Sequence, residues 1–166
     1  MLTSFDQLPD DARVWIYQMD RELTPSEQEV VSSVIKKFCE SWQVHGQNIR
    51  TSFKLEYNHF LILAVDESQV SASGCSIDSS VHALKALQAN LGIDFFDRKK
   101  TAFLRDGKIE LISLQRVKEK LKAGVMNAQT ITFNNMVTSK GELADKWKIA
   151  IKDSWLARHL PKGALA

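Results

Sequence analysis

The stretch FLILAV at residues 60–65 decides the fold, because it is the longest apolar run in the chain. It is far shorter than the ~20 residues that a membrane-spanning helix needs, so it is predicted to be a buried strand. A second run, RVWIYQ at residues 13–18, is rich in the β-branched and aromatic residues that favour strands. Strands that are apolar on both faces lie inside a sheet. We therefore expect 13–18 and 60–65 to be the two inner strands.

Residues 50–57 show a different pattern, with strict alternation of polar and apolar side chains. Thr51, Phe53, Leu55 and Tyr57 fall on one face of this segment. Alternation of period two is typical of a strand with one solvent-exposed face and one buried face. It predicts an edge strand, joined to 60–65 by a tight turn.

Two helices are predicted between these strands and after them. Thr24 is followed by Pro25 and, three residues past the cap, by Glu27, which is a helix-start signature. This helix is expected to cover residues 25–44 and to stop at Gly46. A serine-rich loop then precedes a second helix, whose apolar stripe ends at Gly92. The stripe consists of Val81, Leu84, Leu87 and Leu91.

With a further strand at 101–104, the predicted order is β-α-β-β-α-β, that of the ferredoxin-like fold. We expect an α+β chain with a mainly antiparallel sheet, extended by a hairpin strand at 108–112 and by C-terminal helices, the last over 142–156. The chain is expected to form one domain over 1–166, in which 1–104 is the core and 105–166 packs on it. Two helices cover only one face of such a sheet. The C-terminal segment with Trp147 and Trp155, or a second copy of the chain, is expected to cover the other face.

Charge and composition exclude several classes of protein. The 166 residues carry 22 Lys and Arg against 20 acids, a net charge of +2, well short of a typical nucleic-acid binder. No secretory leader is recognisable, so we expect a cytoplasmic protein with two free thiols and no membrane partner. The chain lacks C-x-x-C and H-x-x-x-H spacings and any phosphate-binding loop. We therefore expect no metal, no cofactor and no P-loop ATPase activity.

The segment SGCSID at residues 73–78 is the most distinctive candidate site. It joins the buried strand to the second predicted helix, where unpaired amides and the helix dipole favour a thiolate at Cys75. His45 and Asp66 are the candidate base and orienting acid beside it. The candidate ligand-binding residues around the same bend are Ser73, Gly74, Ser76, Glu67 and Asp78. Two other interpretations stay open for this bend: Cys75 packs as a small side chain under a helix cap, or the amides bind an anion, which Asp78 would oppose.

The motifs FCESWQVHG, FLILAVDES, SASGCSID, LGIDFFDRK and FNNMVTSKGELADKW resemble those of an uncharacterised bacterial protein family. The resemblance covers most of the chain. Some members of that family carry the label "ABC transporter ATPase", which this sequence does not support, because it has neither a Walker loop nor an LSGGQ-like signature. The resemblance implies no activity.

The sequence leaves two main hypotheses for the function. The first is a non-enzymatic binding or protein-interaction domain, as a homodimer or with an unknown protein partner. The second is a cysteine-dependent enzyme or redox switch that uses Cys75. Nucleic-acid binding through the basic segment 116–122 is a third and weaker hypothesis.

Overall fold

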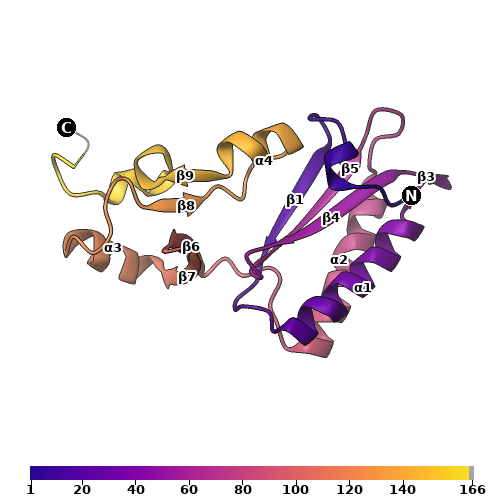
Figure 1. Cartoon of the computed structure of the whole chain (residues 1–166). Helices are drawn as coiled ribbons and strands as arrows, with labels where there is room; N and C mark the ends of the chain where they lie inside the picture. The colour runs from indigo at the N-terminus through magenta and orange to yellow at the C-terminus, as the bar shows by residue number, and fades with distance from the viewer. Residues whose placement is uncertain (165–166) are drawn as a thin grey trace.

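The computed structural model of the chain describes residues 1–164, so the last two positions of the predicted domain lie outside the described residues. The chain is mixed α and β, with two antiparallel sheets of three and four strands and a small two-stranded hairpin. Figure 1 shows the two larger sheets side by side, with helices α1 and α2 on the outer face of the first sheet. None of the described helices is long and apolar enough to cross a membrane.

The first sheet has the order β1-β5-β4, with all neighbours antiparallel. Its strands are β1 (Arg13–Gln18), β4 (Arg50–Glu56) and β5 (Phe60–Asp66). Strand β5 pairs along its length with both neighbours, and all seven of its residues are buried. The predictions that 60–65 is central and that 50–57 forms an edge are therefore confirmed.

The predicted ferredoxin-like strand order is wrong at its fourth strand. That strand, β6 (Lys100–Arg105), does not pair with β1 but lies in the second sheet, of order β7-β6-β8-β9. The outer edge of β1 is already occupied, since Val14 N–H donates to Thr138 O and Lys140 N–H donates to Ala12 O. Strand β1 therefore forms the edge of its sheet rather than one of its inner strands.

Helices α1 (Pro25–Ser41) and α2 (Gly74–Leu91) cover one face of the first sheet. A capping box between Thr24 and Glu27 starts α1, as the sequence predicted. The helix ends at Ser41 and not near residue 44. The residues that follow form a hairpin of β2 (Gln43–Val44) and β3 (Gln47–Asn48) instead. The positive φ of 77° at Gly46 therefore serves the hairpin turn.

The C-terminal part of the chain contacts the opposite face of β5. Phe60 lies 4.8 Å from Phe133 and 5.1 Å from Trp147, measured between ring centroids. Trp147 is buried, whereas Trp155 is 49% exposed, so of the two tryptophans in the segment expected to cover this face only Trp147 is buried. Because side chains of this chain fill the second face, that face gives no support to a homodimer.

The second sheet combines two six-residue strands with two three-residue strands. Its strands besides β6 are β7 (Lys108–Ser113), β8 (Ile131–Phe133) and β9 (Lys148–Ala150), and helix α3 (Leu114–Lys122) follows β7. The predicted helix over 142–156 is replaced by α4 (Lys140–Lys146), strand β9 and two 3-10 turns, η2 (Ile151–Asp153) and η3 (Trp155–His159). A backbone bond from Asn134 N–H to Trp147 O ends the helical region and directs residues 148–150 into the sheet.

A chain of side-chain hydrogen bonds joins the two sheets. Gln18 donates from Nε2 to Lys100 O at 2.9 Å, and its Oε1 accepts from Asn135 Nδ2 at 3.1 Å. Asn135 Oδ1 in turn accepts from Trp147 Nε1 at 3.0 Å. Both polar ends of the Asn135 amide are thus satisfied, which fixes the approach of α4 to β1.

Candidate functional site

The carboxyl end of β5 holds the most constrained of the candidate side chains, Asp66. It is buried, forms an ion pair of 3.0 Å with Arg50 on the neighbouring strand, and accepts from Ser68 N–H at 3.0 Å. The hydrogen bonds from Ser68 lower the pKa of the Asp66 carboxyl below its usual range, and Arg50 adds to this effect. Asp66 is therefore a fixed carboxylate whose two oxygens are both engaged.

Glu67 shapes the loop that follows β5. Its Oε1 accepts from Ala72 N–H at 2.7 Å and lies 3.6 Å from Arg13 Nη1. The first contact closes residues 67–72 into a loop, and the second ties that loop to β1. This geometry gives Glu67 a structural role in the loop that leads to α2.

Ser73 and Ser76 are used by the start of α2 itself. The Ser73 hydroxyl accepts from Ser76 N–H, and the Ser76 hydroxyl donates to Ser73 O at 2.8 Å. Ser76 is buried, whereas Gly74 and Asp78 are exposed. The Ser76 O–H is therefore already used as a donor within the first turn, and the Ser73 hydroxyl is held in place by the amide that it caps.

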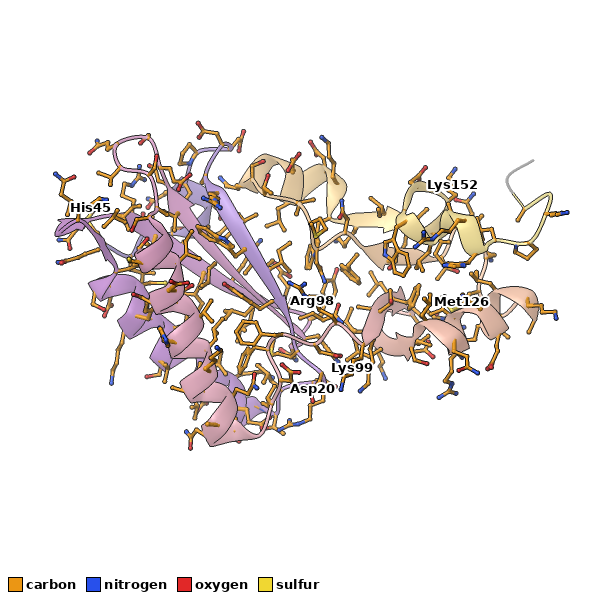
Figure 2. All side chains as sticks on the ribbon, turned by 180° about the vertical axis from the view of Figure 1, so that it is seen from behind. Asp20, His45, Arg98, Lys99, Met126 and Lys152 are labelled. Atoms are coloured by element: carbon orange, nitrogen blue, oxygen red, sulfur yellow. The ribbon has the colours of Figure 1, made fainter. Side chains whose placement is uncertain are left out.

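Cys75 and His45 lie on separate elements. Cys75 is an exposed residue in the first turn of α2, and His45 is an exposed residue in the β2–β3 turn with φ of 51°. Figure 2 shows His45 at the tip of this hairpin, at the end of the molecule away from the second sheet. Within residues 1–164, no hydrogen bond or ion pair joins Cys75, His45 and Asp66 to one another.

The second cysteine, Cys39, lies in a contrasting environment. It is buried in the apolar layer between α1 and the sheet, and burial raises the pKa of its thiol to about 11. The Thr51 hydroxyl donates to Cys39 O at 2.9 Å, which ties α1 to β4. Both cysteines are free thiols, and only Cys75 is accessible to a reagent.

A shallow pocket of about 100 Å³ lies beside Asp66, between the β2–β3 hairpin and the loop after β5. Asp66 is the one predicted site residue among those that line it. The lining residues are Gln47, Asn48, Ile49, Arg50, Asp66, Ser68, Gln69 and Val70. Sequence reasoning missed the glutamines and the asparagine, because the segment that carries two of them was predicted to follow a longer helix. The polar run that follows the apolar strand, from Asp66 to Gln69, was the available signal.

Within the described part of the chain, no group of three or more His, Cys, Asp or Glu side chains could hold a metal ion. The pocket beside Asp66 also lacks a cysteine or histidine. Its chemistry is that of amides, one hydroxyl and one ion pair, which suits recognition by hydrogen bonds.

Comparisons with protein-family models, with curated proteins and with solved structures give no match to this chain. The resemblance to an uncharacterised bacterial family, together with its transporter label, therefore stays a prediction.

Proposed function

We propose that this chain is a binding domain that recognises an extended segment of a protein partner at the pocket beside Asp66. The observation that carries the proposal is the set of exposed amide side chains around that pocket. Gln47 and Gln69 are exposed, and neither side chain has a hydrogen-bond partner among the described residues. A primary amide both donates and accepts, so it can bond to the N–H and C=O groups of a peptide backbone.

The hairpin next to the pocket supports the same ligand chemistry. Strands β2 and β3 pair only with each other, which leaves backbone groups on their outer edges unpaired by any other strand. An extended peptide can add to such an edge by main-chain hydrogen bonds, while side chains nearby give specificity. The Arg50–Asp66 pair at the pocket floor provides one fixed charge of each sign.

A selection from a library of displayed random peptides tests this proposal. Peptides enriched on the wild-type chain are expected to lose at least tenfold in affinity for the Gln47→Ala/Gln69→Ala variant, about 1.4 kcal/mol. The Asn90→Ala/Gln129→Ala variant is the matched control, since it removes two exposed amides outside the pocket. Failure to enrich any peptide, or equal binding to both variants, would contradict the proposal.

The alternative function is a cysteine-dependent enzyme or redox switch. One observation favours it: Cys75 is exposed in the first turn of a capped helix. We expect Cys75 to react with iodoacetamide in the folded chain and Cys39 to be protected by burial. The rate at Cys75 as a function of pH decides between the two functions. A rate that stays high at pH 6, where an ordinary thiol is protonated, favours the redox alternative. A rate that falls like that of a free peptide thiol removes this alternative.

A further inference from the structure

Positive charge is concentrated in one segment of the chain, which the net charge of +2 does not reveal. Residues 98–122 contain nine Lys and Arg against three Asp and Glu, a net charge of +6, so the remaining residues together carry −4. This segment comprises the end of the connection from α2, the β6–β7 hairpin and helix α3. Figure 2 shows Arg98 and Lys99 on that connection, at the start of the second sheet.

A second pocket, of about 260 Å³, lies within this basic segment and is separate from the pocket beside Asp66. Its lining residues are Lys100, Glu110, Leu111, Ile112, Ser113, Arg116 and Lys120. Three cations thus face one carboxylate. Glu110 lies 3.0 Å from Arg105 and 3.5 Å from Lys120, so its charge is already compensated. The lining as a whole carries a charge of +2, which matches a dianion.

Two of the cations in the pocket lining, on helix α3, repel each other. Arg116 and Lys120 are one helical turn apart on α3, and like charges at this spacing destabilise a helix. Arg116 has no ion pair within the described residues. Buried Val117 and Leu121 on the adjacent face of α3 anchor the helix to the core, so the helix holds its cations at the pocket. An anion between them would remove the repulsion.

We propose that this pocket binds a phosphate group. The planar Arg116 guanidinium can donate two parallel hydrogen bonds to phosphate oxygens, and the ammonium groups act as point charges. Lys100 Nζ donates to Asp20 O at 3.3 Å, which leaves two of its three N–H donors for a ligand. Ser113 adds a hydroxyl that makes no capping bond to α3. The phosphate can be a terminal group of a small molecule, with three non-bridging oxygens and up to two charges, or a backbone phosphodiester of a nucleic acid, with two such oxygens and one charge. Both offer anionic oxygens to the same cations.

Calorimetric titration of the full chain with inorganic pyrophosphate tests the proposal. The Arg116→Ala/Lys120→Ala variant is expected to bind at least about tenfold more weakly than the wild type, because two charge-assisted contacts are lost. Lys118→Ala/Lys122→Ala is the matched control, since it removes the same charge from the same helix at exposed positions outside the pocket lining. The control is expected to bind within a factor of about two of the wild type. Thermal unfolding by circular dichroism verifies that both variants are folded.

Two results would overturn the proposal: no binding of pyrophosphate or oligonucleotide by the wild type, or equal weakening in both double variants, which would show a diffuse charge effect. A labelled single-stranded oligonucleotide in a second arm identifies the source of the phosphate. Tighter binding of the oligonucleotide, lost in the pocket variant, assigns the site to a nucleic-acid backbone. Tighter binding of pyrophosphate assigns it to a small phosphorylated molecule. Neither arm of the experiment involves the pocket beside Asp66. The phosphate proposal therefore succeeds or fails independently of the peptide proposal.

Discussion

The first sheet and the second sheet differ in the length and burial of their strands and in what covers them. The first has one strand, β5, that is buried over its whole length and is covered by two long helices. The second combines two six-residue strands, β6 and β7, with two three-residue strands, β8 and β9, and it relies on contacts with β5 for part of its core. The comparison shows that one fully buried strand organises both regions, because its two faces are covered by different parts of the chain. The two proposed binding sites lie outside this core, one beside each sheet.

Phe60→Ala is expected to give the largest effect, since it tests whether the two regions share a core. Phe60 is fully buried and contacts Phe133 and Trp147 across the sheets. Loss of this ring should lower the free energy of unfolding by about 3–5 kcal/mol. Urea unfolding followed by far-UV and near-UV circular dichroism measures it. Two separate unfolding transitions in the wild type would contradict a shared core, because they would show that the two regions unfold independently.

Asn135→Ala is expected to have an intermediate effect. The substitution leaves Trp147 Nε1 and Gln18 Oε1 without their partner, at a cost of about 1–3 kcal/mol in unfolding free energy. Chemical denaturation against the exposed Asn90→Ala control provides the measurement. A stability equal to that of the control would show that this hydrogen-bond chain does not hold the two sheets together.

Thr24→Ala and Ser113→Ala compare equivalent positions in the two regions. Thr24 accepts from Glu27 N–H at the start of α1, whereas Ser113 makes no side-chain bond at the start of α3. We expect a loss of about 1 kcal/mol for Thr24→Ala and no measurable change for Ser113→Ala. Thermal unfolding of both variants measures the difference, and equal losses would contradict it.

Acid is expected to weaken the first region through Glu27. Hydrogen bonds from Arg21 and then from the Thr24 backbone lower the pKa of Glu27 to about 2, against an ordinary value of 4.5. Because the folded-state pKa is the lower one, this stabilisation is full above pH 4.5 and is lost as the pH falls towards 2. Stability curves of Glu27→Gln should be flatter than wild type in that window. Glu29→Gln, another carboxylate on α1, controls for net charge, and a curve as flat as that of Glu27→Gln would count against the assignment.

The sequence predicted the elements whose local pattern is complete. The apolar run at 60–65, the alternation at 50–57 and the capping box at Thr24 each specify one structure, and each is confirmed. The partner of β6 was predicted wrongly because nothing local marks which edge a strand joins. That choice depends on residues 138–140, which occupy the edge of β1 from a distant part of the chain.

The candidate site was harder to predict for the same reason. Asp66 lines a pocket together with the loop that follows it, but the opposite wall comes from residues 47–50, beside a hairpin that was not predicted from the sequence. For the basic pocket beside α3, the sequence indicated only the basic segment 116–122, because net charge averages over the whole chain. Separate counting of charge along the sequence would have found the excess over 98–122.

Native-state hydrogen exchange tests most directly whether β5 is the shared centre of both regions. We expect the amides of Phe60–Asp66 to exchange more slowly than those of β7, whose outer edge has no neighbouring strand in the described sheet. Trp147→Ala should speed exchange in β5 as well as in β8 and β9, because it removes contacts on the second face. Exchange in β5 as fast as in β7, or unchanged by Trp147→Ala, would contradict the account.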